Sequence, residues 1–329
     1  MKVDSETPLY SGGSVSKLEA TLKLFVLKAK HGWTDKSFTD LLKELKKILP
    51  KDNTLPERNY DAKKMLCPLG MEYERIHACS NNCILYRNEY ANYNACPRCG
   101  KSRYKPKVGE VDNDEPSSKG TPAKVLWYLP IVPRFKRLFA NPEDAKRLTW
   151  HVDERVCDGK LRHPADSPQW KKIDERYPFF GSEARNLRLG LATDGMNPYG
   201  QMSSIHSSWP VLLCIYNLSP TVCMKRKYIM LSMMISGPKQ PGNDIDTYLS
   251  PLIDELKGLW VDGIDVYDDY RKDTFKLRAM IFCTINDFPA YGNISGYSVK
   301  GKYGCPICMA GTCSQWLKHG KKTVYMGHQ

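Results

Sequence analysis

The chain has 329 residues, of which 41% are hydrophobic and 26% charged, a globular composition that excludes a wholly disordered or fibrous protein. No run of about 18 apolar residues occurs, so no transmembrane helix is predicted, and the polar, acid-containing N-terminus lacks the pattern of a signal peptide. The formal net charge of +13 favours a polyanionic partner such as nucleic acid.

Two amphipathic helices are predicted within residues 1–65. Residues 16–30 begin with Ser16 and Glu19 at the spacing of a capping box, and residues 35–49 place apolar side chains at helical spacing before a proline. The face that the first helix is expected to bury consists of Leu18, Leu22, Phe25 and Val26. Because the polar faces mix lysine with acidic residues, we interpret the region as a helical hairpin that packs on its neighbours, and not as a DNA-reading helix-turn-helix.

Residues 66–105 are rich in cysteine, asparagine and tyrosine. Without a signal peptide a reducing compartment is expected, where disulfides are disfavoured and paired cysteines indicate metal sites. This segment supplies two pairs of thiols separated by 12 residues, which suits a tetrahedral zinc ion with a structural role. The predicted ligands are Cys79, Cys83, Cys96 and Cys99, with His77 as a substitute.

Residues 106–122 contain almost no apolar residue and are predicted to form a linker. The region 123–185 is expected to be basic and helical at first, and irregular over residues 150–178. Asn141 and Pro142 divide the helical part into two short helices, with Asn141 as the N-cap of the second. The side chains predicted to contact DNA phosphates are Arg134, Lys136, Arg137, Lys146 and Arg147.

From residue 186 onward the pattern changes to strands. The predicted order is strand, strand, strand, helix, strand, over residues 187–194, 209–218, 227–235, 246–260 and 276–285. This order is that of a ribonuclease-H-like core, of α+β or α/β class, in which helices cover a sheet with antiparallel and parallel strands. The first and fourth strands are neighbours in such a sheet, so Asp194 and Asp287 are expected to meet at the strand ends.

Paired carboxylates at strand ends are suited to Mg²⁺, which prefers hard oxygen ligands. Two such ions held close together activate a nucleophile and stabilise the leaving oxygen of a phosphodiester. The spacing alone leaves a second interpretation open, because Asp194-Gly195 and Asn286-Asp287 are also common turn dipeptides.

Several long motifs resemble those of one transposase family. Residues 189–200 (LGLATDGMNPYG) closely resemble the block that carries the first catalytic aspartate in plant CACTA-type (En/Spm) transposases, and residues 286–296 (NDFPAYGNISG) resemble the second block. The segment 305–328 is similar to the region downstream of the second block in that family, and the cysteine-rich segment 76–104 resembles the region upstream of the transposase core.

The resemblance implies a DDE/D transposase, which binds transposon ends and cuts and joins DNA by in-line phosphoryl transfer with two Mg²⁺ or Mn²⁺ ions. Asp194 and Asp287 would be the first two metal ligands. DNA in the nucleus is the implied substrate, and a second copy of the chain or a full-length transposase is the implied protein partner.

The sequence departs from that family at the third carboxylate, which lies downstream of a Cys-x2-Cys block in the family. No Asp or Glu follows Asp287 in this chain. We therefore expect residues 186–329 to be a truncated core that does not cleave or join DNA by itself. The alternative is a non-catalytic, zinc-containing protein that binds DNA or another protein.

Cys305 and Cys308 form half of a second metal site of the Cys-x2-Cys type. The ligands that complete it stay open, and the candidates are Cys313, His319 and His328.

Overall fold

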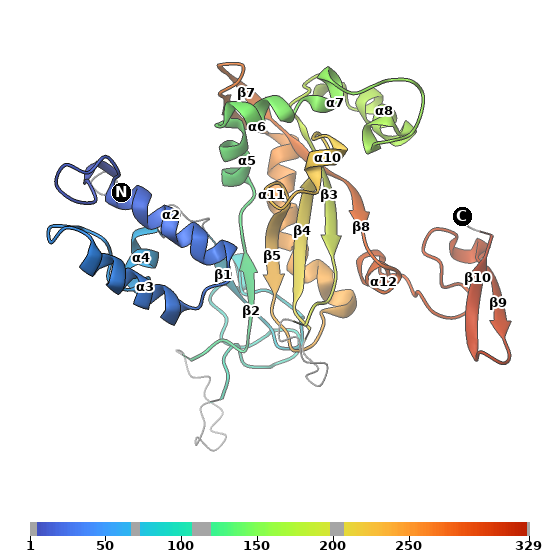
Figure 1. The fold of residues 1–329 in the computed structure, drawn as a ribbon. Helices are drawn as coiled ribbons and strands as arrows, with labels where there is room; N and C mark the ends of the chain where they lie inside the picture. Colours follow the sequence, from blue (N-terminus) through green and yellow to red (C-terminus); the bar gives the residue numbers. More distant parts are fainter. Residues whose placement is uncertain (1–4, 67–72, 107–119, 198–206, 328–329) are drawn as a thin grey trace. The chain divides into compact units, whose positions relative to one another are not determined.

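The computed structural model describes residues 5–66, 73–106, 120–197 and 207–327. The chain divides into two compact units, Met1–Glu72 and Tyr73–Gln329 (Figure 1). Each unit has a hydrophobic core of its own. Among the described residues, no helix combines the length and apolar character that crossing a membrane requires.

The first unit is helical. Its described helices are α2 (Lys17–Lys30), α3 (Asp35–Ile48) and α4 (Asn59–Leu66). Both predicted helices are confirmed, and the Ser16 hydroxyl caps α2 by accepting a hydrogen bond from the Glu19 amide at 3.1 Å. This cap involves two residues only three positions apart, so the sequence pattern locates the start of α2 well.

The face that α2 buries differs from the predicted one. Leu22 and Val26 are 42% and 55% exposed, whereas the Phe25 ring contacts Phe38 of α3 edge-on with 5.7 Å between centroids. Phe38 and Leu42 are fully buried at the centre of this small core. Because α2 packs against α4 as well as α3, its neighbours and not its periodicity alone decide which side chains are covered.

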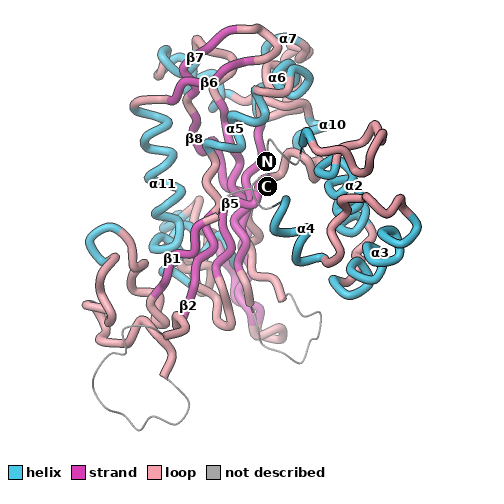
Figure 2. The backbone as a smooth tube through the Cα atoms, turned by 90° about the vertical axis from the view of Figure 1, so that its left-hand side faces the viewer, coloured by secondary structure: helices cyan, strands magenta, loops and turns pink. Residues whose placement is uncertain are grey.

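Six of the described strands form one sheet in the second unit (Figure 2). In spatial order they are β1 (Glu74–Ala78), β2 (Lys124–Tyr128), β5 (Met230–Ile235), β4 (Trp209–Ile215), β3 (Leu187–Thr193) and β8 (Ala279–Ile285). Neighbouring strands are antiparallel except β3 and β8, which are parallel. The four predicted strands are confirmed as β3, β4, β5 and β8, and the predicted pairing of the first and fourth is the β3–β8 pair. β1 and β2 lie in segments for which no strand is predicted.

One face of the sheet packs against the long helix α11 (Ile245–Val261), which Figure 2 shows alongside the strands. Leu187, Leu189 and Leu191 of β3 alternate toward this face and are at most 2% exposed. Tyr248 and Leu252 of α11 are fully buried in the same core. Burying one such leucine contributes about 1.5–3 kcal/mol, so this face stabilises the second unit.

The opposite face, near the start of β3, is covered by a segment for which the sequence pattern predicts irregular structure. That prediction is wrong: the segment forms α7 (Trp150–Asp153), α8 (Pro168–Arg176) and α9 (Pro178–Gly181). Ser167 caps α8 by accepting a hydrogen bond from the Trp170 amide at 3.2 Å, and Trp170 is buried. A serine followed by proline is a helix-start signal, which the surrounding charges of both signs obscure.

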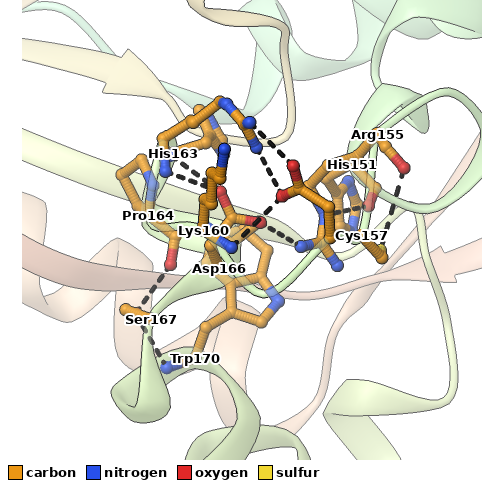
Figure 3. A network of polar contacts seen from close by, with 12 residues as sticks. His151, Arg155, Cys157, Lys160, His163, Pro164, Asp166, Ser167 and Trp170 are labelled. Carbon is orange, nitrogen blue, oxygen red and sulfur yellow. Dashed lines mark hydrogen bonds and ion pairs between the residues drawn. The ribbon is translucent and has the colours of Figure 1, made fainter.

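A polar network supports this cover (Figure 3). The Asp166 carboxylate accepts hydrogen bonds from the His163 amide at 2.9 Å and from the Arg155 guanidinium. Arg188 of β3 is 1% exposed, and its guanidinium lies 4.2 Å from the Trp170 ring centroid. This buried cation is paired with Asp174 of α8, which offsets its desolvation.

The other described elements are α5 (Val132–Phe139), α6 (Pro142–Arg147), α10 (Pro220–Cys223), α12 (Phe288–Ser295), and the hairpins β6 (Ile264–Asp268) with β7 (Asp273–Leu277) and β9 (Cys313–Leu317) with β10 (Lys322–Met326). Asn141 caps α6 as predicted, accepting from the Asp144 amide at 3.0 Å. The strand predicted over 276–285 begins only at Ala279, because β7 belongs to a separate hairpin. Most of the predicted linker lies outside the described residues.

Candidate functional site

The two predicted aspartates follow the carboxyl ends of adjacent parallel strands. Ala192 of β3 pairs with Ile285 of β8, and Asp194 and Asp287 each lie two residues further on, at the same level. Both are exposed, and both line one pocket of about 430 Å³ together with Thr193, Pro210 and Asn286 among others. The structure therefore brings these carboxylates, predicted from the sequence, to a single pocket.

Asp194 is held by its neighbours in the chain and by the return strand β4. Its Oδ1 accepts a hydrogen bond from the Gly195 amide at 2.6 Å. Gly195 allows a close approach, since a Cβ there would lie 2.7 Å from Ser207 Oγ and 2.9 Å from Trp209 Nε1. The Thr193 hydroxyl donates to a backbone carbonyl of β4 at 2.8 Å. The carboxylate thus lies between the Thr193 hydrogen bond to β4 and the close packing of Gly195 against Ser207 and Trp209.

Asp287 is the N-cap of α12. Its Oδ1 accepts a hydrogen bond from the Ala290 amide at 2.8 Å, and the positive end of the helix dipole favours its negative charge. A carboxylate offers about four acceptor positions, so this bond leaves capacity for a cation in the pocket. The turn-capping interpretation of the sequence and the cation-binding one are therefore compatible at this residue.

The pocket offers hard oxygen ligands, which suit Mg²⁺ or Mn²⁺ with several retained waters. Among the described residues, no third acid, histidine or cysteine joins Asp194 and Asp287 in a compact group of ligand atoms. The two carboxylates that line this pocket are therefore candidate ligands of a hard divalent ion.

A second group of candidate ligands has four members close together. The sulfur atoms of Cys79, Cys83, Cys96 and Cys99 all lie within 4.8 Å of one another, and Cys79 Sγ is 3.5 Å from Cys99 Sγ. Cys79 and Cys96 are buried at 0% and 2% exposure. Four thiolates at tetrahedral spacing are compatible with zinc, so the predicted cysteines come together as expected.

Each pair of cysteines lies on a tight turn. The Cys79 amide donates to the Ile84 carbonyl at 3.0 Å, and the Asn81 amide donates to Cys79 Sγ at 3.3 Å. In the second turn the Cys96 amide donates to the Lys101 carbonyl at 2.8 Å, while Gly100 takes a φ of +73° that favours glycine. Local backbone bonds thus place all four sulfurs on one side of the two turns.

Backbone amides and burial act differently on the thiols. The backbone N–H of Lys101 stabilises the thiolate of Cys99 and lowers its pKa to about 7. Burial instead raises the pKa of the Cys79 thiol. A bound zinc ion supplies the charge that keeps a buried thiolate ionised, which fits this donor set.

His77, the substitute ligand, lies outside the group of sulfurs. Its Nδ1 accepts a hydrogen bond from Arg103 Nε at 2.8 Å. Burial and the nearby Arg103 and Arg75 lower the pKa of His77, so the ring is a neutral acceptor. The Arg103 guanidinium also lies 4.8 Å from the Tyr86 ring centroid and donates hydrogen bonds to the Ala91 and Tyr93 carbonyls.

The cysteine group is tied to the sheet by a contact that no sequence motif predicts. Lys124 Nζ of β2 and the Tyr248 hydroxyl of α11 both donate to Asn82 Oδ1, at 2.7 Å and 2.6 Å. Asn82 lies in the first cysteine turn with a positive φ of 64°. Burial lowers the pKa of Lys124 to about 8. The sequence carries no signal for this triad, because its members are far apart in the chain.

The second cysteine pair is less complete. The Cys308 amide donates to Cys305 Sγ at 3.4 Å and lowers the pKa of that thiol. Cys313 begins β9, and both Cys313 and His319 are exposed. In the described part of the chain these residues form no group of three ligands, and His328 lies outside it.

The five predicted DNA contacts lie in α5 and α6 but differ in exposure. Arg134 is 6% exposed, so burial limits its access to a phosphate. Lys136, Arg137, Lys146 and Arg147 are exposed. Arg147 donates to the Tyr228 hydroxyl at 2.8 Å, just before β5 begins.

These basic helices and the aspartates lie at opposite ends of the sheet. Tyr228 precedes the first residue of β5, whereas Pro210, which lines the aspartate pocket, pairs with Met234 near the end of that strand. Figure 1 likewise shows α5 and α6 at the end of the sheet where β3 and β8 begin. Phosphate contacts beside the aspartates must therefore come from other residues.

Comparison with known families gives a match to a transposase family. Residues 158–329, slightly more than half of the chain, match the model of the transposase family tnp2. A search of curated proteins finds no match to the chain. The matched range contains β3, β8 and the aspartate pocket and excludes the four-cysteine group.

Proposed function

Because this chain belongs to the transposase family tnp2, we propose that its second unit acts on DNA at the pocket of Asp194 and Asp287, in the manner of CACTA-type (En/Spm) transposases. The main observation behind the proposal is that two carboxylates, 93 residues apart in sequence, line one pocket. Each lies two residues beyond a paired position at the ends of adjacent parallel strands. The substrate is a phosphodiester of DNA. The net charge of +13 on the chain favours binding of this polyanion.

The strand order supports a ribonuclease-H-like core for this proposal. The antiparallel strands β5, β4 and β3 are consecutive neighbours, and β8 joins β3 in parallel after the helix α11. This arrangement is the one expected from the predicted order of strands and helix.

In the proposed mechanism the chain positions two carboxylates. Asp194 is oriented by Gly195, and Asp287 by the first turn of α12. Mg²⁺ or Mn²⁺ held by Asp194 and Asp287 would supply Lewis-acid stabilisation for the attacking and leaving oxygens of the phosphodiester. Both aspartates are already engaged by backbone amides, so their carboxylates are preorganised and need little rearrangement to accept a cation.

We propose that the chain binds a cation and DNA without cleaving the DNA by itself. Among the described residues, Asp194 and Asp287 line the pocket and no third acid joins them in a compact group of ligand atoms. A second copy or a full-length transposase is the proposed protein partner.

The four cysteines have a structural part in this proposal. A closed group of four thiolates stabilises a fold and leaves no open position for chemistry. The triad of Asn82, Lys124 and Tyr248 connects that group to β2 and α11. A nuclear location is proposed from the DNA substrate alone.

The test is a titration of the purified, zinc-loaded chain with Mn²⁺, followed by electron paramagnetic resonance of the free ion. We expect Asp194→Asn and Asp287→Asn each to weaken Mn²⁺ binding by about tenfold or more, because each removes one of two charged ligands. Asp262→Asn is the matched control, since Asp262 is an exposed acid at the end of α11. Equal Mn²⁺ binding by all four proteins would overturn the aspartate site.

The same proteins are then incubated with duplex DNA and Mn²⁺. No cleavage or joining is expected. Strand cleavage that disappears in Asp194→Asn would support the aspartate site and contradict the proposed inactivity. DNA binding without any effect of the aspartates on Mn²⁺ would favour the second candidate, a non-catalytic zinc-containing binding protein, which the complete cysteine group supports.

A further inference from the structure

A row of paired residues crosses the sheet from its β1 edge to the aspartates. Arg75 of β1 pairs with Trp127 of β2, Trp127 pairs with Met234 of β5, and Met234 pairs with Pro210 of β4. The pairing of β4 with β3 continues this level from Pro210 to Asp194. Asp287 then follows at the same level beyond β8.

The side chains of this row share one face of the sheet. Their sequence neighbours Leu126 and Met233 are 0% exposed and belong to the core under α11. Trp127 and Met234 alternate with them and are partly exposed, as is expected for the opposite face. Pro210 and Asp194 line the same pocket, so the row ends at the candidate metal site.

The far end of the row carries a cation held on an aromatic surface. The Arg75 guanidinium lies 5.0 Å from the Trp127 ring centroid, and the Tyr73 ring lies 5.3 Å from the same centroid. Arg75 is exposed, and Tyr73 is 57% exposed. Within the described residues the Arg75 guanidinium has no acidic partner, so its charge is available to an anion.

The spacing between this cluster and the aspartates matches a short stretch of DNA. Trp127, over whose ring the Arg75 guanidinium lies, is on β2, and three strand spacings separate β2 from β3, which amounts to about 14 Å at roughly 4.8 Å each. One DNA strand places a phosphate about every 3.4 Å along the helix axis, so this distance corresponds to about four nucleotides.

We propose that Tyr73, Arg75 and Trp127 form a DNA-contact site about four nucleotides from the phosphate that occupies the aspartate pocket. The inference rests on the proposed function for the position of that phosphate. Arg75, supported by Trp127, binds a backbone phosphate, and the exposed ring of Tyr73 stacks on an unpaired base. The partner is therefore duplex DNA whose unpaired nucleotides begin about four nucleotides from the site of action.

The experiment measures fluorescence anisotropy of a labelled duplex with a single-stranded overhang, and of the same duplex with blunt ends, over a range of salt. We expect Arg75→Gln to weaken binding to both about fivefold to tenfold, and to lower the slope of log affinity against log salt by about 0.9. Tyr73→Leu is expected to weaken binding of the overhang duplex alone by about tenfold, because base stacking is lost.

Arg226→Gln is the matched control. Arg226 is an exposed arginine just before β5, at the opposite end of the sheet, and its removal changes the net charge equally. Binding should change less than about twofold with this variant. Arg75→Lys keeps the charge and should retain the salt slope, while zinc content and thermal melting check that every variant is folded.

Equal effects of Arg75→Gln and Arg226→Gln would overturn the proposal, since total charge alone would then explain binding. A cluster that contacts protein in place of DNA would give the same result. The salt series contains no added divalent cation, so failure of the aspartate site appears in the manganese titration and leaves this measurement interpretable.

Discussion

The two candidate ligand groups of this chain differ in how they are assembled. The four cysteines lie on two neighbouring turns held by local backbone bonds, and their sulfurs converge within 4.8 Å. Asp194 and Asp287 are 93 residues apart and meet only because β3 and β8 pair in parallel. The first group depends on short stretches of chain, whereas the second depends on the whole sheet.

The two groups also differ in solvent exposure, which fits different functions. Cys79 and Cys96 are buried, as a structural metal site requires. Asp194 and Asp287 are exposed and line one pocket. Substitutions in the cysteine group should therefore reduce zinc binding, whereas substitutions around the aspartate pocket should reduce Mn²⁺ binding.

The largest effect is expected from removing a cysteine ligand. Structural zinc ions in small domains bind with apparent free energies of about 10–16 kcal/mol, so Cys96→Ser should lose most of its zinc and melt at a markedly lower temperature. Metal analysis and calorimetry provide the measurement. Cys157→Ser changes an exposed cysteine outside the group and should keep full zinc, as should His77→Gln. Full zinc in Cys96→Ser would contradict the four-cysteine assignment.

A smaller effect that spares zinc is expected from crowding the sheet. A Cβ at Gly190 of β3 would lie 2.7 Å from Cys214 Sγ and 2.7 Å from the Tyr216 ring. Gly190→Val should therefore cost about 1–3 kcal/mol of unfolding free energy and weaken Mn²⁺ binding, measured by urea denaturation and titration. The control Gly258→Ala adds a methyl group to an open position of α11. Loss of zinc in Gly190→Val would mean that the two regions are not independent.

The stability of the helices that cover the start of β3 should depend on pH, because His151 of α7 is buried among them. Burial, with a further contribution from Arg188, lowers the pKa of His151 from 6.5 to about 4. The unfolded chain takes up this proton at higher pH than the folded one, so the contribution of His151 is complete above pH 6.5 and is lost as the pH falls toward 4.

That loss should be on the order of 3 kcal/mol between the two limits. Urea denaturation at several pH values measures it, and His151→Gln should reduce the slope because glutamine does not titrate. Zinc content is followed in parallel, since protonation of the thiolates releases the metal. An unchanged slope in His151→Gln would show that other groups cause the acid sensitivity.

The smallest effect separates two roles of Asp287. Asparagine caps a helix about as well as aspartate, whereas alanine loses about 1 kcal/mol. Asp287→Ala should therefore be less stable than Asp287→Asn, while both bind Mn²⁺ weakly. Equal stability of the two variants would mean that the bond to the Ala290 amide contributes little.

The sequence alone located the features that depend on neighbouring residues. Ser16 and Asn141 mark helix starts because each side chain caps an amide three residues later. Leu187, Leu189 and Leu191 indicate a strand because side chains alternate along an extended backbone. The four cysteines are recognisable for the same reason, since two short turns present all of the ligands.

Only the tertiary structure decided what depends on distant residues. Leu22 is exposed and Arg134 is buried, which is the reverse of what the sequence pattern predicts for each. The neighbours of each helix determine which side chains are covered. The bonds from Lys124 and Tyr248 to Asn82 leave no trace in local sequence, because strand pairing and packing bring these residues together. Short-range geometry can be deduced from a few side chains, whereas long-range contacts depend on the free energy of the whole fold.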